Sequence, residues 1–447
     1  MVNFINIFSD YLNKIDKYCC RKYILDDVHF TRRRKIWIDD LIIHLLASKN
    51  RTNVVECLSF YQELKRDDFV TITPQAFSDK RQYLDPRVFV DMNSDVMAEI
   101  YNNSDELKDF KGYIILGCDT SVIDCPNTPL TKKEMNVPQD NPATKYHSRA
   151  RISAITDDLN HFILSSEIAP KKTSEISLAI NHINDLKDKI DITETVTIYD
   201  RGYPSIKLIL HHLINNSHFI IRLKENNFKK QREKMLSNDE NIQIKVKKIH
   251  KKDLTNEEKI IAKKIGNPTL RVVNIPITRA NGKKYTETLI TDMPPEIFTP
   301  EDLKKLYGTR WETETNFNRL KNRLDIENFS GQKKVTIEQD FYSHIYIFNL
   351  LMATLNDATE KINRKSRKDV QEKLEYKPNL NTIIGLIRKN ILKLIFEDQA
   401  TKTKIINYII EIASKNLVTT KKNPPTNTNN RQTQDPTNKH PGNYRKP

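Results

Sequence analysis

The chain has 447 residues, of which 38% are hydrophobic and 29% charged, a balance typical of globular domains with a sizeable core. No apolar run approaches the roughly 20 residues that cross a bilayer, which excludes a helical membrane protein. The 73 Lys and Arg residues against 58 Asp and Glu give a formal net charge of +15. This surplus favours a polyanionic partner, although a lysine-rich solubilising surface gives the same count.

Cysteine usage and the first residues indicate the compartment. The five cysteines are an odd number, and none forms a Cys-x-x-Cys pair. They argue against a disulfide framework or a cysteine zinc site and fit a reducing environment. Asp10 and Asp16 stand where a secretory signal would be uncharged, so we expect no export and a cytoplasmic, nucleoid-associated protein.

Residues 1–108 are predicted to be helical. Apolar positions recur near a 3.6-residue period between residues 36 and 46, after a basic run. Thr73 and Pro74 are typical of the N-cap and first position of another helix, which carries Lys80 and Arg81. A DNA-reading helix and a helical bundle with a solvated basic face both explain this pattern.

The next part of the chain alternates between strands and helices. Short apolar runs predict the strands, and amphipathic runs predict the helices. The predicted elements are strands at 113–116, 151–156 and 162–168, a helix from its N-cap Ser174 to about 189, a strand at 195–199, a helix at 204–212 and a strand at 218–223. This order predicts an α/β fold with a mixed sheet.

Residues 225–295 are predicted to interrupt this sheet as a β-rich lobe with a basic surface. Apolar alternation indicates strands at 242–249 and 270–277, and Asn281-Gly282 is typical of a tight hairpin turn. Basic residues outnumber acidic ones by 13 to 7 between positions 224 and 264.

The rest of the chain is predicted to be helical up to a polar tail. The expected elements are a long helix from Pro300 to about 324, helices at 338–362 and 380–417, and a disordered basic tail from 419.

The most informative motif lies in the long helix and consists of Tyr307, Arg310, Glu314 and Lys321. At about 100° per residue these positions fall within a roughly 60° arc, so one helix face presents a phenol, two cations and a carboxylate. The carboxylate can bind a divalent metal, and the cations can hold phosphate oxygens. An exposed helix with ordinary ion pairs is the alternative.

Two aspartates upstream complete a candidate set. Asp119 follows the strand predicted at 113–116, and Asp200 follows the strand predicted at 195–199. Carboxylates at the ends of core strands are costly unless a metal or a cation neutralises them. A turn-forming Asp119 and a helix-capping Asp200 are the alternatives.

Together these residues resemble the bacterial insertion-sequence transposases of the Asp-Asp-Glu (DDE) type. The likeness covers roughly residues 30–350. The matching features are Asp119 on a strand, Asp200-Arg201-Gly202-Tyr203 after another strand, and the complete Tyr-x2-Arg-x3-Glu-x6-Lys pattern.

The resemblance implies a fold class and a division into domains. A ribonuclease-H-like mixed sheet with helices would be interrupted by a β-rich insertion and flanked by helical regions. The implied parts are a DNA-binding region at 1–108, a catalytic core at 109–224 and 296–362, a basic insertion at 225–295, C-terminal helices at 363–418 and a disordered tail at 419–447.

The resemblance also implies a metal site. Asp119, Asp200 and Glu314 would be the catalytic residues, binding two Mg²⁺ ions about 3.5–4 Å apart, with Mn²⁺ as a substitute. No protein nucleophile is needed, because water or a DNA 3′-OH attacks the phosphate.

The DNA-binding residues are implied in the same way. Tyr307, Arg310 and Lys321 would position the DNA backbone, with Arg201 and Tyr203 as further contacts. The implied activity is cleavage of DNA at the terminal repeats of a transposable element and joining of the 3′-OH ends to target DNA. The implied partners are double-stranded DNA and a second copy of the chain in a synaptic complex, without a membrane. An inactive DNA-binding relic and a ribonuclease-H-like nuclease that does not join DNA are the alternatives.

Overall fold

The computed structural model describes residues 3–63, 72–135, 148–278, 282, 284–366 and 375–420. One sheet runs through the middle of the molecule. Its strands are β1 (Ile114–Asp124), β2 (Arg149–Asp157), β3 (Ile163–Pro170), β4 (Thr195–Tyr199), β5 (His218–Arg222), β6 (Asp239–Gln243), β7 (Thr269–Thr278) and β8 (Lys284–Thr291). Their order across the sheet is β3-β2-β1-β4-β5-β8-β7-β6.

The sheet is mixed. β1, β2 and β3 form an antiparallel meander, and β4 and β5 continue from β1 as parallel neighbours. Parallel neighbours need crossover connections, which helices supply here. The sequence predicted this α/β fold class with its ribonuclease-H-like mixed sheet, and the structure confirms it.

Helices make up most of the remaining chain. The N-terminal region contains α1 (Phe4–Leu12), α2 (Ile38–Ala47), α3 (Asn53–Glu63), α4 (Pro74–Arg81) and α5 (Arg87–Asn103), with 3-10 turns at Ile15–Tyr18 and Arg21–Tyr23. Between β1 and β7 the chain forms α6 (Pro129–Glu134), α7 (Glu175–Leu186), a 3-10 turn at Ile192–Glu194, α8 (Ile206–Ile214), α9 (Lys229–Arg232), a 3-10 turn at Lys248–Lys251 and α10 (Asn256–Ile265). The C-terminal half contains α11 (Pro300–Thr309), α12 (Trp311–Asn322), α13 (Lys334–Ser366), α14 (Leu380–Phe396) and α15 (Gln399–Lys415), and the short strands β9 (Glu375–Pro378) and β10 (Leu417–Thr420) pair with each other.

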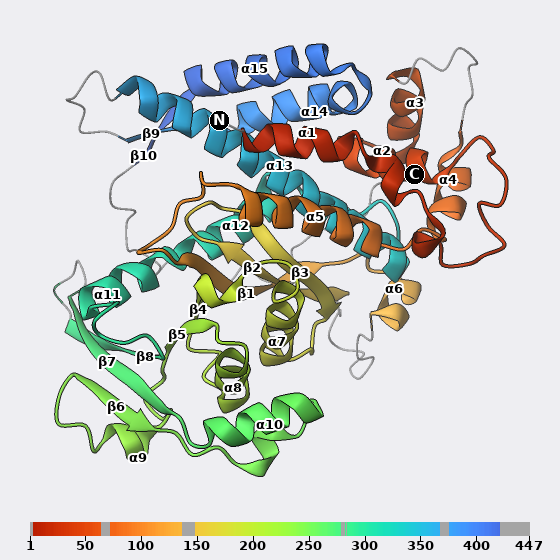
Figure 1. Ribbon diagram of the computed structural model, residues 1–447. Helices are drawn as coiled ribbons and strands as arrows, with labels where there is room; N and C mark the ends of the chain where they lie inside the picture. Colours follow the sequence, from red (N-terminus) through yellow and green to blue (C-terminus); the bar gives the residue numbers. More distant parts are fainter. Residues whose placement is uncertain are drawn as a thin grey trace.

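The helices cover the two faces of the sheet in different ways. α5 and α13 pack on β3 from one side, whereas α7 packs on β2 and β3 from the other and α8 on β5. Figure 1 shows the N-terminal and C-terminal helices gathered together above the sheet, with α7 and α8 below it. The long α13 contacts α1, α2, α5, α14 and α15, so it forms the centre of this helical layer.

Several local signals act as the sequence predicts. The Thr73 hydroxyl accepts a hydrogen bond from the Ala76 N–H, with Pro74 at the first helical position of α4. The Ser174 hydroxyl caps α7 by accepting from the Ser177 N–H. Both caps satisfy donors that a helix N-terminus would otherwise leave without a partner.

The segment 225–295 differs from the predicted interruption, because its strands extend the core sheet. β8 pairs antiparallel with β5, and β7 and β6 follow in order. Val272 and Val273 on β7 point to opposite faces of the sheet and are both buried. Two buried faces let these strands cover an edge that β5 would otherwise leave open. Of the expected hairpin turn, Asn281 lies outside the described residues, and Gly282 has a positive φ of 77°.

Two helices predicted as continuous are divided. The helix from Pro300 ends at Thr309 and a second begins at Trp311, and the Thr309 hydroxyl bonds back to the Leu306 carbonyl beside this break. The segment 380–417 divides after Phe396, where the Asp398 side chain accepts from the Thr401 N–H and caps a new helix.

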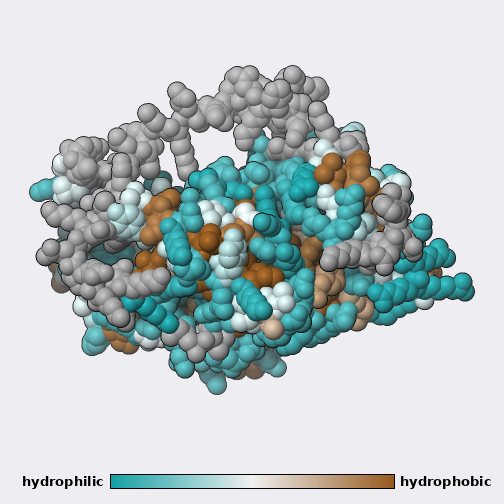
Figure 2. All heavy atoms as spheres, turned by 90° about the horizontal axis from the view of Figure 1, so that it is seen from above, coloured by the Kyte–Doolittle hydropathy of each residue, from teal (hydrophilic) through white to brown (hydrophobic). Residues whose placement is uncertain are grey.

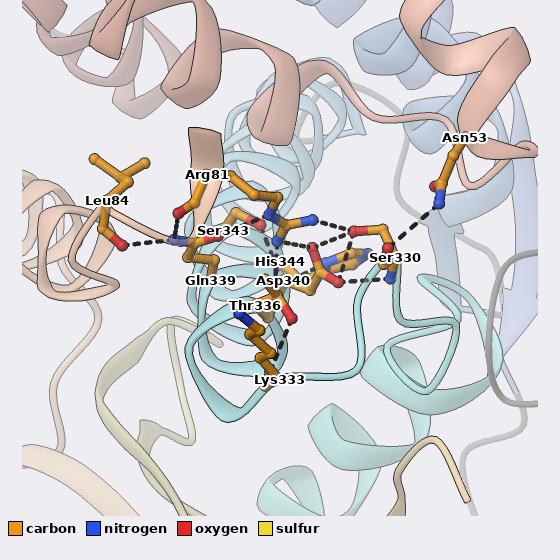
Figure 3. A network of polar contacts seen from close by, with 10 residues as sticks. All are labelled: Asn53, Arg81, Leu84, Ser330, Lys333, Thr336, Gln339, Asp340, Ser343 and His344. Atoms are coloured by element: carbon orange, nitrogen blue, oxygen red, sulfur yellow. Dashed lines mark hydrogen bonds and ion pairs between the residues drawn. The ribbon is translucent and has the colours of Figure 1, made fainter. Parts of the chain in front are cut away.

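A buried polar network joins the N-terminal region to α13. Arg81 at the end of α4 is 2% exposed, and its guanidinium donates to the Asp340 carboxylate (2.8 Å), to the Gln339 side chain (2.8 Å) and to the Thr336 carbonyl (3.0 Å). Figure 3 shows these residues meeting Ser330, which bonds Asp340 in turn. Since Arg81 is enclosed, it cannot read DNA in this structure.

The surface over the terminal helices is mostly hydrophilic. Figure 2 looks onto this side and shows apolar residues in patches between hydrophilic ones. Phe396 and Tyr408 on the last two helices are each 56% exposed. Among the described residues, no helix combines the length and the apolar composition needed to span a bilayer. The predicted disordered tail lies outside the described residues from position 421.

Candidate active site

Asp119 and Asp200 are brought together by the register of two parallel strands. β1 and β4 pair with Cys118 opposite Tyr199, so Asp119 and Asp200 are the next residues on each side. Neighbouring strands lie about 4.8 Å apart. Side chains alternate along a strand, so Asp119 faces the same way as the buried Ile115, and Asp200 continues the face of the buried Ile198.

Glu314 comes from α12, which packs on β1 and β2. The Arg310 guanidinium lies between it and Asp119. One Arg310 nitrogen is 2.8 Å from a Glu314 carboxylate oxygen, and the other is 3.5 Å from an Asp119 oxygen. The Arg310 side chain is only 13% exposed, so water screens these charges weakly.

Tyr307 connects the third carboxylate to this cluster. Its hydroxyl donates to Asp200 Oδ1 at 3.1 Å, and its ring centroid lies 5.8 Å from the Arg310 guanidinium carbon. Burial raises the pKa of Tyr307 to about 12, so the phenol stays protonated and can keep donating. Tyr307 is 8% exposed and packs within an apolar cluster under α11, which fixes its position.

The carboxylates influence one another electrostatically. Burial raises the pKa of Asp119 to about 6, and the negative charges of Glu314 and Asp200 add to this rise. The Thr120 N–H and the Arg310 guanidinium oppose it. The site is therefore a concentration of negative charge that one buried cation balances only in part.

The chemistry of this donor set fits a divalent cation. Mg²⁺ prefers carboxylate oxygens; two of the three carboxylates, Asp119 and Glu314, contact the Arg310 guanidinium, and the third, Asp200, accepts from Tyr307. Within the described part of the chain, no three His, Cys, Asp or Glu side chains meet at metal-binding spacing. Arg310 fills the gap between Asp119 and Glu314, so an ion would have to replace that side chain.

The other predicted DNA contacts occupy different environments. Lys321 lies seven residues after Glu314 on α12, and its ammonium donates to the Val122 carbonyl of β1 at 2.6 Å. Arg201 is exposed beside Asp200. Tyr203 is 1% exposed and packs against Tyr199 with ring centroids 5.2 Å apart. Its burial argues against the predicted contact between Tyr203 and DNA.

Two residues of the site were not predicted. Arg222 at the end of β5 lies with its guanidinium carbon 5.7 Å from the centroid of the Tyr307 ring and forms a 3.1 Å ion pair with Glu287 of β8. Burial raises the pKa of Glu287, while Arg222 lowers it. A charged residue ending the apolar strand 218–222 was a signal for Arg222. No local sequence pattern indicated Glu287, because its place in the site depends on the pairing of β5 with β8.

A second polar group lies on the opposite face of β1. Glu175, the first residue of α7, accepts a hydrogen bond from the Thr120 hydroxyl at 3.1 Å and pairs with Arg151 of β2. A Cβ on Gly202 would lie 3.3 Å from Glu175, so the loop after Asp200 passes close to this group. The Thr120 contact ties the residue after Asp119 to α7.

The chain is similar to known transposases. A family model described as "Transposase DDE domain" matches residues 114–350, more than half of the chain. No curated protein matches. Among solved structures, the cryo-EM structure of a piggyBac transposase synaptic complex with hairpin DNA is similar with a TM-score of 0.44 and 10% identity, covering 92% of this chain and 85% of that chain. From the match to the family model, the chain belongs to the DDE transposases.

Proposed function

We propose that this transposase is of the bacterial insertion-sequence type with the Tyr-Arg-Glu-Lys motif. It would cut DNA at the ends of its element and join the 3′-OH ends to target DNA, with Asp119, Asp200 and Glu314 as the metal ligands. The observation that carries the proposal is the convergence of these carboxylates, from two strands and a helix, around Tyr307 and Arg310.

The proposed cofactor is a pair of Mg²⁺ ions, with Mn²⁺ as a substitute. Bound divalent ions activate an attacking hydroxyl and stabilise the leaving oxygen. In the free protein Arg310 holds Asp119 and Glu314 together and limits their repulsion. In the loaded protein its guanidinium would become available to a DNA phosphate, for which its planar fork is well suited.

The proposed DNA surface starts at the site and extends over the basic parts of the chain. Lys321 and the exposed Arg201 flank the carboxylates and would bind backbone phosphates. The N-terminal helices within 1–108 and the basic segment 225–295 would carry the DNA on either side. The net charge of +15 supports this, because phosphate binding releases counterions.

A second copy of the chain is proposed to pair two DNA ends. The helices within 363–418 are candidates for part of that contact. Most of their apolar residues pack inside the monomer, which leaves Phe396 and Tyr408 exposed. The complex should contain two chains and two DNA ends, and complexes that contain only one chain and one unpaired end would contradict this.

A nicking and joining assay tests the function. Inverted repeats in the DNA flanking the coding region supply the substrate, and Glu314→Gln is the control. The wild type should nick the repeats in Mg²⁺ and join precleaved ends to a plasmid, whereas Glu314→Gln should bind the DNA without nicking. If neither protein nicks, the chain is a DNA-binding relic. If the wild type nicks but never joins precleaved ends, it is a nuclease.

A further inference from the structure

Close beside Glu314, helix α12 meets β1 at a glycine. A Cβ on Gly117 would overlap the Thr313 hydroxyl and lie 2.6 and 2.8 Å from the carboxyl oxygens of Asp158. A residue without a side chain therefore leaves the space that this contact needs. Gly117 precedes Asp119 by two positions, so both face α12.

Thr313 anchors the first turn of α12. It is fully buried, and its hydroxyl donates to Asp158 Oδ1 at 2.8 Å and lies 2.9 Å from the Thr156 hydroxyl. Thr313 immediately precedes Glu314. A helix turns about 100° per residue, so the orientation of Thr313 sets the direction in which Glu314 points.

Asp158 provides a fixed base for this anchor. It lies in the turn between β2 and β3, is 2% exposed, and its N–H donates to the Ile115 carbonyl of β1 at 2.9 Å. Burial raises its pKa well above the usual range. Among the described residues its second carboxyl oxygen has no hydrogen-bond partner. Burying a carboxyl oxygen without a hydrogen-bond partner costs folding free energy, so we expect this group to have a role beyond packing.

A second polar contact pins the far end of the same helix. The Lys321 ammonium donates to the Val122 carbonyl, so α12 is tied to the sheet near both ends. The break at Arg310 separates α12 from α11, so the first turn of α12 depends on its own contacts. The Thr313 contact ties this turn to the sheet, and Glu312 approaches His161 at 3.5 Å.

We propose that Asp158 and Thr313 are positioning residues that hold Glu314 at ion-binding distance from Asp119. They do not touch the ion. This inference rests on the proposed function, since it assigns Glu314 as a metal ligand. Residues that orient metal ligands typically change metal affinity by about 10–100-fold when they are replaced.

Binding of Mn²⁺ to the full chain without DNA tests the proposal. Electron paramagnetic resonance measures free Mn²⁺, and the melting temperature in chelator reports folding separately. Thr313→Val removes the hydroxyl at nearly constant shape and should raise the Kd for Mn²⁺ about tenfold. Thr313→Ser keeps the hydroxyl and should restore wild-type affinity. Thr315→Val is the matched control, because its hydroxyl bonds the Trp311 carbonyl of α12 itself and not the sheet in the described structure.

The outcomes separate this inference from the proposed function. If Asp119→Asn and Glu314→Gln lose the ion but folded Thr313→Val keeps it, the positioning role is wrong and the site stands. If the triad variants also keep the ion, both proposals fall. Should Thr313→Val not fold, Asp158→Leu carries the same test. If that variant does not fold either, the pair is structural and the inference is overturned.

Discussion

At the residue scale, the guanidinium of Arg310 contacts two carboxylates at once, and Lys321 lies on the same helix. Both are proposed to bind DNA phosphates. Arg310→Ala or Lys321→Ala should weaken binding to the element's ends and make the slope of log K against log salt about 0.9 less steep for each phosphate that the variant no longer binds. Fluorescence anisotropy at several salt concentrations measures this slope.

The matched control for these variants is Lys361→Ala. Lys361 pairs with Glu411 on the C-terminal helices, away from the site, and its removal should leave the slope unchanged. Wild-type slopes for Arg310→Ala and Lys321→Ala would remove both residues from the DNA surface.

Gly117 supports a prediction about stability. Gly117→Ala should destabilise the protein by about 1–3 kcal/mol, because the new methyl group overlaps Thr313 and forces α12 away from β1. Gly385→Ala is the matched control. It lies in α14 with nothing within 4 Å of its Cβ position, and alanine should stabilise that helix by about 0.5–1 kcal/mol. Urea denaturation measures the unfolding free energy of both variants. An unchanged unfolding free energy for Gly117→Ala would show that a methyl group fits between β1 and α12.

At the element scale, the network that joins α4 to α13 contains one buried ion pair, between Arg81 and Asp340. Arg81→Met removes the Arg81 charge that pairs with the enclosed Asp340 carboxylate and should cost about 3–5 kcal/mol of unfolding free energy. Adding Asp340→Leu should recover part of this loss, because the apolar pair carries no buried charge.

The control for this ion pair lies on the surface of α13. Arg364→Met breaks an exposed pair with Glu360 and should cost no more than about 0.3–0.5 kcal/mol. Equal losses for Arg81→Met and Arg364→Met would contradict the distinction between buried and exposed pairs.

At the scale of the whole molecule, local patterns were predictable and long-range pairing was not. The order of strands and helices follows from apolar periodicity. Of the residues in the Tyr-Arg-Glu-Lys spacing, Tyr307 and Glu314 lie beside Arg310, whereas Lys321 contacts the Val122 carbonyl. The pairing of β8 with β5 joins segments about 70 residues apart, so no local pattern contained it. For the same reason, Glu287 and the Asp158–Thr313 contact became visible only in three dimensions.

The burial of Arg81 and Tyr203 also depends on long-range packing that no local pattern predicts. The sequence predicts Tyr203 as a DNA contact and places Arg81 on a helix for which DNA reading is one of two interpretations. Whether a polar side chain faces solvent depends on the elements that cover it, and here α13 encloses Arg81 while the core around Tyr199 encloses Tyr203.

The central claim is that Asp119, Asp200 and Glu314 bind a shared pair of divalent ions, and cysteine substitution tests it most directly. A thiolate is a poor ligand for Mg²⁺ and a better one for the softer Mn²⁺. Asp119→Cys, Asp200→Cys and Glu314→Cys should each fail to nick terminal-repeat DNA in Mg²⁺ and regain nicking in Mn²⁺. Full nicking activity of these variants in Mg²⁺ would contradict the claim. It would also be contradicted if the wild type nicks in both metals and none of the variants regains nicking in Mn²⁺.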